Sequence, residues 1–461
     1  MAIDLIIRGG TVVTATERRT EDVAVEAGRI VEVGARLAAP ADAREVDASG
    51  LLVLPGVVDV HTHTRVASDE SPDRFFQDSV AAAFGGTTTF LAFNNPGTGS
   101  DQTGSLPSDA TAWRRQTDSD SAVDYGLNLV LQPAHADNLA AEIPAVIEMG
   151  VPTFKAFMVY DFGLPPAAIG VALRAAARAR GMLMVHGEDR AALEANIARL
   201  KAQGKTQPRY HAQSRPPYVE AAGTRMAVEM ARAEDAPVYL VHLSSQEALA
   251  EVEKGRAVGG QVFVETCPHF LVLDESRYLL PDAQCACFVI SPPLRSPADR
   301  DALWEALAHG ALNAVSTDHV PDTVADKRGW DECFDLISNG APGIETLLTN
   351  VYGQGVARGR LTVERMVDVL STTPARLFGL PSKGAIEPGK DADLVLFDPQ
   401  ERRTVTQAEL HHTSDFTPYE GLATSGIVRS TIVRGEFVIR DGHFVGRRGH
   451  GQFQERRLTW R

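Results

Sequence analysis

Residues 54–64 read LPGVVDVHTHT, an apolar run that ends in two histidines. Four later runs have the same form: VPTFKAFMVY (151–160), GMLMVHGED (181–189), PVYLVHLSS (237–245) and ALNAVSTDHVP (311–321). Each has the unbroken Val, Leu, Ile or Phe character of a strand buried on both faces, and polar residues come at its C-terminal end. This arrangement is typical of a parallel barrel whose active site is assembled from the strand ends.

The sequence between residues 54 and 379 alternates apolar strands with Ala-rich helical segments, which indicates repeated βα units. Three further strand candidates, TTTFLAF (87–93), YGLNLVLQP (125–133) and VFVETCPHF (262–270), bring the total to eight, the number that closes a TIM barrel. Residues 1–53 and 380–461 read as short alternating strands. We therefore predict an α/β fold, in which a (β/α)8 TIM barrel carries a small β-sandwich domain built from both chain ends.

Composition excludes several classes of partner. The chain has 461 residues and a net charge of -15, which argues against nucleic acid and against an anionic membrane surface. No apolar run is long enough to cross a bilayer, and the first residues are not expected to be a signal peptide. The four cysteines form no CxxC pair, which favours a reducing cytoplasm. The basic stretch from Arg447 to Arg461 is expected to be a solvated tail or a subunit contact.

The polar residues at the strand ends are of the types that bind metal ions. His61 and His63 are two apart on a strand, so both imidazoles project from one face and can bind one ion. Taken singly, His186 and His242 would each more often be a hydrogen-bonded buried histidine than a ligand, and Asp318 would fit a helix N-cap or a turn. Because all five share the same structural position, we interpret them as one metal centre.

Lys155 is the unusual member of this set. Burial disfavours the charged ammonium, so a neutral and nucleophilic amine becomes accessible. Such an amine can capture carbon dioxide as a carbamate, whose two oxygens and negative charge can bridge two divalent ions. The alternative is a lysine that is paired with a nearby carboxylate.

The motifs together resemble the cyclic-amidohydrolase branch of the amidohydrolase superfamily, and within it the hydantoinase and dihydropyrimidinase group. The resemblance rests on the HTH, FKAFMVY, MVHGED, VHLSSQEAL, VETCPHFLVLDESRY, ISPPLR, STDHVP and NGAPGIE segments and covers nearly the whole chain. It implies hydrolysis of a hydantoin or dihydropyrimidine ring to an N-carbamoyl amino acid. It also implies two zinc ions bridged by N6-carboxylated Lys155, and a homotetramer. Manganese or cobalt would suit the same ligands.

The resemblance also assigns roles to individual residues. His61, His63 and Asp318 would hold the first metal, His186 and His242 the second, and carboxylated Lys155 both. Asp318 would in addition act as base and then as acid. Tyr160 would donate a hydrogen bond to the developing oxyanion, and Ser291 and Asn339 would hold the cyclic imide.

Some residues depart from the hydantoinase pattern and leave an alternative open. Arg65 makes the first motif HTHTR, which is similar to dihydroorotases, where an arginine at this place binds the substrate carboxylate, and Asn95 falls near a second such position. An allantoinase or a dihydroorotase-like enzyme would use the same six ligands. Against dihydroorotase stand Tyr160 and the serine of ISPPLR. A surface ion pair for Arg65 and a turn position for Asn95 are equally consistent with the sequence. A non-catalytic, dihydropyrimidinase-related scaffold is disfavoured because all six ligands are present.

Overall fold

The computed structural model describes residues 3–38, 40–94 and 104–459. Its centre is an eight-stranded sheet in which every neighbouring pair of strands is parallel. The strands follow one another in chain order: β6 (Val57–Thr62), β7 (Thr87–Phe93), β8 (Asp124–Val130), β9 (Thr153–Phe157), β10 (Met182–His186), β11 (Val238–Leu240), β12 (Val262–Thr266) and β13 (Ala314–Val315). The first and last strands meet where Asp318 N donates to His61 O (2.9 Å) and His63 N donates to His319 O (2.7 Å), which brings the sheet round into a barrel.

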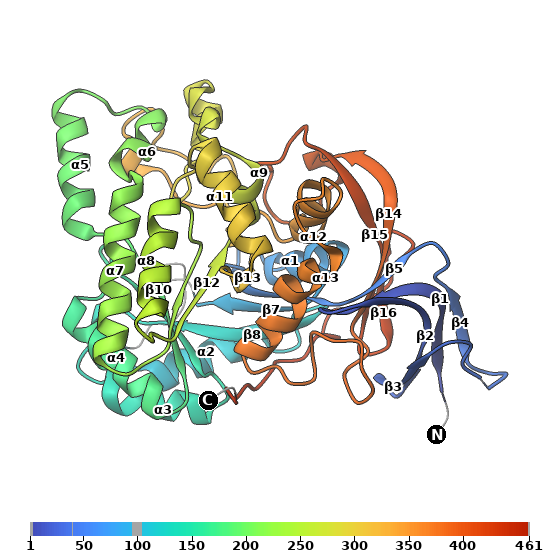
Figure 1. Ribbon diagram of the computed structural model, residues 1–461. Helices are drawn as coiled ribbons and strands as arrows, with labels where there is room; N and C mark the ends of the chain where they lie inside the picture. Colours follow the sequence, from blue (N-terminus) through green and yellow to red (C-terminus); the bar gives the residue numbers. More distant parts are fainter. Residues whose placement is uncertain (1–2, 39, 95–103, 460–461) are drawn as a thin grey trace.

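Helices follow the strands and cover the outside of the barrel, as Figure 1 shows. The helices are α1 (Arg74–Phe84), α2 (Leu106–Thr117), α3 (Leu139–Glu148), α4 (Pro166–Arg178), α5 (Arg190–Ala202), α6 (His211–Ser214), α7 (Pro217–Ala233), α8 (Gln246–Ala257), α9 (Pro268–Val272), α10 (Asp282–Ala286), α11 (Pro297–Ala308), α12 (Leu347–Val351), α13 (Val363–Val367) and α14 (Thr373–Leu377). Their apolar faces pack with outward strand residues in the largest hydrophobic cluster of the described chain.

Both ends of the chain contribute to a second sheet of nine strands. It consists of β1 (Leu5–Val13), β2 (Arg18–Glu26), β3 (Arg29–Gly34), β4 (Arg44–Asp47), β5 (Leu52–Pro55), β14 (Leu394–Thr404), β15 (Ala423–Val433), β16 (Glu436–Arg440) and β17 (His443–Phe444). The ends meet at the antiparallel pair β5 and β14, and Figure 1 shows the blue and red segments side by side. The predicted fold class is confirmed, whereas the division at residues 53/54 and 379/380 remains a prediction.

The interior of the barrel is apolar at its lower end, where the strands begin. Val58, Leu91 and Met182 pack there with Leu377 of α14 and with Leu458 from the C-terminal segment. Arg456 is fully buried beside them and donates to Leu127 O, Phe378 O and Thr153 Oγ1. The expectation of a solvated basic tail is therefore wrong for Arg456, because its guanidinium satisfies barrel groups that would otherwise be buried without partners.

Strand alternation determines which side chains enter the barrel. In β9, Phe154 and Ala156 face the helices, so Lys155 and Phe157 point inward. The pairing of β6 with β7 shifts register between Asp59 and Thr62, and this irregularity turns His61 inward next to Val60. Within the described residues, no helix is long and apolar enough to cross a membrane.

Candidate active site

A compact group of ligand atoms lies where β6 meets the chain after β13. Asp318 Oδ1 lies 2.9 Å from His61 Nε2 and 3.2 Å from His63 Nε2. One ligand atom from each of the three residues falls within 4.8 Å of the others, a spacing that can hold a metal ion. Although burial favours the neutral acid, His61 and His63 hold the pKa of Asp318 well below its usual value, so the carboxylate is ionised.

Lys155 lies in the middle of β9 rather than at its end. Its side chain is fully buried, its Nζ is 3.4 Å from His61 Nε2, and it lies over the rings of Phe93 and Phe157 at 4.9 and 5.0 Å from their centroids. Burial lowers the pKa of Lys155 to about 8, although Asp318 and Glu265 act in the opposite direction. The neutral amine that carbamate formation requires is therefore far more accessible near neutral pH than in an exposed lysine.

His186 and His242 lie close to the same group from the neighbouring strands. Their ring centroids are 4.6 Å apart, and the His242 ring is 5.4 Å from that of His61. Burial lowers the pKa of both imidazoles, so both are neutral at pH 7, the form that binds metal. Among the described residues, neither Nδ1 atom has a hydrogen-bond partner, although both atoms are buried. Two unpartnered imidazole nitrogens, on rings that lie beside a ligand cluster, fit a metal centre.

Three residues of this region have backbone in the left-handed conformation that favours glycine. They are Tyr160 (φ 69°), His242 (φ 42°) and Asp318 (φ 51°). Non-glycine residues adopt this conformation at a cost in free energy, and they gather at functional sites where the fold holds them in place. The backbone therefore marks the same end of the barrel as the ligand atoms.

A cavity of about 300 Å³ opens over the ligand cluster. Tyr160 lines it beside Phe157 and Phe162, with ring centroids 5.9 and 5.2 Å away. Burial raises the pKa of Tyr160, although the Arg215 charge opposes this shift. The hydroxyl is therefore protonated at neutral pH and can donate a hydrogen bond into the cavity.

The other residues expected to hold substrate also border this cavity. Ser291 and Asn339 lie together, with Ser291 Oγ 2.7 Å from Asn339 Oδ1. Arg65 lines the cavity as well and forms an ion pair with the fully buried Asp322, which lies 3.7 Å from Lys327. The ion pair of Arg65 is therefore part of the cavity wall. Asn95 lies outside the described residues.

Sequence reasoning missed Glu265, a carboxylate inside the buried strand β12. Its Oε1 accepts from His61 Nδ1, and its Oε2 accepts from the Tyr239 hydroxyl at 2.9 Å. A carboxylate bonded to Nδ1 fixes the His61 ring so that Nε2 faces the ligand cluster. The signal was present in VFVETC, because a glutamate in a strand buried on both faces needs a partner.

Glu188 and Arg215 were missed in the same way. Glu188 Oε2 lies 2.6 Å from His186 Nε2 and also pairs with Arg215. Despite burial, Arg215 and His186 lower the pKa of Glu188 to about 2. Glu188 follows His186 by two residues in MVHGED, so its position was visible in the sequence, whereas its pairing with Arg215 was not.

The sequence pattern of the amidohydrolase family matches residues 52–438. The chain is 37% identical over 463 residues to a D-hydantoinase of Ralstonia pickettii, and 99% of each sequence is covered. It belongs to the amidohydrolase family. This family member is also 37% identical to a D-phenylhydantoinase of Escherichia coli (strain K12), with 98% of each covered. Its structure matches that of a dihydropyrimidinase from Brevibacillus agri NCHU1002 with a TM-score of 0.93 and 36% identity over 99% of each chain.

Membership of the amidohydrolase family implies a metal centre with two ions, and the residues present fit one. His61, His63 and Asp318 form a group that can hold an ion, and the His242 ring lies 5.4 Å from that of His61. The buried Nδ1 atoms of His186 and His242 have no hydrogen-bond partner among the described residues. The predicted resemblance to the hydantoinase and dihydropyrimidinase group is confirmed.

Proposed function

We propose that this protein opens the ring of a hydantoin or a dihydropyrimidine to give an N-carbamoyl amino acid. The observation that carries the proposal is the convergence in one cavity of the ligand cluster around Asp318, the Tyr160 hydroxyl and the pair Ser291 and Asn339. The names of the similar proteins, which are hydantoinases and a dihydropyrimidinase, support the same reaction class.

The reaction adds the hydroxyl of water to a ring carbonyl carbon, breaks the C–N bond and delivers a proton to the ring nitrogen. His61, His63 and Asp318 would hold one divalent ion, His186 and His242 the other, and N6-carboxylated Lys155 both. When bound, such ions lower the pKa of water and polarise a carbonyl oxygen. Zinc is proposed, and manganese and cobalt suit the same ligands.

The protein's own groups supply the remaining chemistry. The ionised carboxylate of Asp318 takes the proton from the attacking water and passes it to the leaving ring nitrogen. The neutral Tyr160 hydroxyl donates to the oxygen on which charge develops. Ser291 and Asn339 hold the CO-NH-CO edge of the ring, and Arg65 lines the same cavity.

A rate comparison tests this function. Zinc-loaded protein is assayed on dihydrouracil, 5-substituted hydantoins, allantoin and dihydroorotate, and the N-carbamoyl product is identified. We expect the hydantoins or dihydrouracil to be preferred, and Tyr160→Phe to lower kcat roughly 100-fold or more. Full activity of chelator-treated protein, or turnover of none of the four substrates, would refute the proposal.

Arg65 in the cavity wall supports a second candidate, an enzyme for an acidic ring such as dihydroorotate. The ion pair with Asp322 holds the guanidinium in the wall, and Lys327 adds a second positive charge to this group. Arg65→Met would then remove the preference for the acidic ring and leave the rate on an uncharged hydantoin within about threefold. Asn95 is proposed as the second residue that binds the carboxylate of an acidic ring.

We also propose a cytoplasmic location and a homotetramer. All four cysteines are free, as a reducing compartment would maintain them. The tetramer is implied by the family resemblance, and sedimentation equilibrium of the purified protein tests it.

A further inference from the structure

His186 has a buried partner that the ligand set does not include. Glu188 Oε2 is 2.6 Å from His186 Nε2, and Glu188 is fully buried. Because an ionised carboxylate only accepts hydrogen bonds, Nε2 carries the ring proton. Nδ1, which lacks a partner among the described residues, is therefore the nitrogen with the free lone pair. Glu188 thus selects the tautomer and the orientation of His186.

Arg215 connects this pair to Tyr160. Its guanidinium forms an ion pair with the same Oε2 atom of Glu188, and its central carbon lies 5.3 Å from the centroid of the Tyr160 ring. The side chain of Arg215 is only 6% exposed, so water does not screen either contact. Arg190 Nη2 also donates a hydrogen bond to the backbone oxygen of Tyr160 at 2.6 Å. The tyrosine is therefore fixed through its backbone and its ring.

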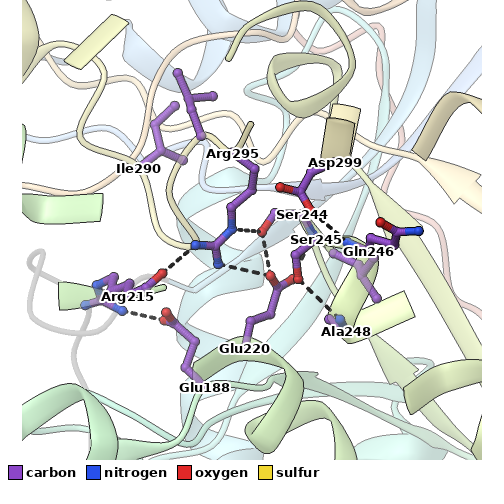
Figure 2. A network of polar contacts seen from close by, with 12 residues as sticks. Glu188, Arg215, Glu220, Ser244, Ser245, Gln246, Ala248, Ile290, Arg295 and Asp299 are labelled. Atoms are coloured by element: carbon purple, nitrogen blue, oxygen red, sulfur yellow. Dashed lines mark hydrogen bonds and ion pairs between the residues drawn. The ribbon is translucent and has the colours of Figure 1, made fainter. Parts of the chain in front are cut away.

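Arg215 is itself anchored by a second buried ion pair, as Figure 2 shows. Arg295 Nη1 donates to Arg215 O, Arg295 Nη2 lies 3.1 Å from Glu220 Oε2, and Arg295 Nε donates to Ser244 Oγ at 3.0 Å. Ser244 follows His242 by two residues, and Arg295 follows Ser291 by four. The network therefore joins the chain segments that carry His186, His242 and Ser291.

We propose that Arg215 is a positioning residue, which holds the Tyr160 hydroxyl over the reacting carbonyl and, through Glu188, holds His186 with Nδ1 toward the ligand cluster. The part that concerns Tyr160 rests on the proposed function. A planar guanidinium can contact a carboxylate and an aromatic ring at once, whereas an ammonium acts as a point charge. Lysine at this position therefore keeps the charge and loses the simultaneous contacts.

The first test is a double-mutant cycle in the full-length, zinc-loaded protein. We expect Arg215→Lys to lower kcat about 30-fold with KM within about threefold of the parent. In a Tyr160→Phe background, the same substitution should lower kcat clearly less than about 30-fold, because the Tyr160 hydroxyl is already absent and only the effect through His186 remains. Losses that multiply fully in the double variant would overturn the link to Tyr160.

The second test reads His186 without any substrate. Zinc affinity is measured by competition with a chromophoric chelator, and we expect Glu188→Gln and Arg215→Gln to weaken it roughly tenfold. Unchanged zinc affinity in both variants would overturn the link to His186. If the parent protein turns over no cyclic amide, the proposed function fails while this measurement still decides the role of Arg215.

Arg456→Lys is the matched control, because Arg456 is also a buried arginine but lies at the opposite end of the barrel. We expect it to lower the melting temperature and to leave kcat, zinc affinity and the coupling to Tyr160 unchanged. If Arg456→Lys lost as much kcat and zinc affinity as Arg215→Lys, a general destabilisation of the protein would explain both variants. This result would overturn the proposal.

Discussion

Two buried lysines lie at opposite ends of the barrel and have opposite surroundings. Lys383 is 1% exposed, and its Nζ is 2.5 Å from Asp124 Oδ2, 2.8 Å from Asp393 Oδ2 and 3.0 Å from Asp391 Oδ2. Lys155 is 0% exposed and has the rings of Phe93 and Phe157 against it. Despite burial, the three carboxylates raise the pKa of Lys383, whereas burial lowers that of Lys155 to about 8.

The difference separates a structural charge from a reactive one. The lower cluster satisfies its cation with carboxylates and ties β8 to the chain before β14. At the upper end, the buried Nδ1 atoms of His186 and His242 have no hydrogen-bond partner among the described residues. The amine of Lys155 lies over two aromatic rings and 3.4 Å from His61 Nε2. Buried polar groups left in this state are costly, and they persist where a ligand or a reaction uses them.

The largest expected effect comes from Lys155→Ala. Removing the amine removes the proposed bridge between the two ions, so we expect loss of bound zinc and a fall of roughly four orders of magnitude in kcat/KM. Zinc content by atomic absorption and the hydantoin assay measure both. A variant that keeps two zinc ions and full turnover would place Lys155 with Lys383, as a structural cation only.

Lys383→Met tests whether the lysine at the lower end has a structural role. It leaves Asp393 without its cation and Asp124 with only Arg434, so we expect a loss of roughly 3 to 5 kcal/mol in the free energy of unfolding. Urea unfolding followed by circular dichroism measures this loss. The kcat of the folded protein should stay within about twofold, and a large fall in kcat would mean that the two ends of the barrel are coupled.

The two lysines also predict opposite dependences of stability on pH. In zinc-free protein, Lys155 titrates at about 8 in the folded state and at about 10.5 when unfolded, so the unfolded chain binds more protons between these values. The buried Lys155 charge therefore lowers the free energy of unfolding by about 3 kcal/mol at pH 7, and this destabilisation disappears as the pH rises to 10.5. Lys383 has a raised pKa in the folded state, so its contribution is complete below pH 10.5 and is lost above it.

Urea unfolding of zinc-free Lys155→Met and Lys383→Met between pH 7 and 11 measures this contrast. Lys155→Met should be more stable than the parent at pH 7, and the gap should close toward pH 10.5. For Lys383→Met, the deficit should stay constant to pH 10.5 and shrink above it. If the free energies of unfolding of the two variants changed with pH in the same way, the surroundings assigned to Lys155 and Lys383 would be contradicted.

The sequence was sufficient for the barrel and for bringing the proposed ligand residues to one region of it. Apolar runs identify strands buried on both faces, and parallel strands bring their C-terminal ends together. This is why His61 meets Asp318, and why the His242 ring lies next to those of His61 and His186. It was also sufficient to bring Tyr160 and Ser291 to the same cavity.

The pairing of charges could not be read from the sequence. His61 and Glu265 are 204 residues apart, and their contact depends on the rotamers of both side chains and on an irregularity in β6. Arg65 could be read as a surface residue because nothing in the sequence points to its partner, the buried Asp322. The position of Arg456 under the barrel likewise depends on where the last segment packs, which composition alone does not determine.

Glu265→Gln gives the smallest expected effect and isolates the charge of one carboxylate at the upper end. Glutamine keeps the volume, and its amide oxygen can still accept from His61 Nδ1, but the negative charge that makes the imidazole a stronger ligand is lost. We expect zinc affinity, measured by chelator competition, to fall about 10-fold to 100-fold.

Asp393→Asn is the matched control for Glu265→Gln, because it removes a buried carboxylate from the Lys383 cluster at the lower end. It should lower the melting temperature and leave zinc affinity unchanged. If Glu265→Gln bound zinc as tightly as the parent, the contact with Phe93, 4.9 Å from the His61 ring, would be sufficient to orient His61. Glu265 would then be a structural carboxylate of the same kind as Asp393. Of these buried charged groups, Lys155 alone would differ in kind between the two ends of the barrel.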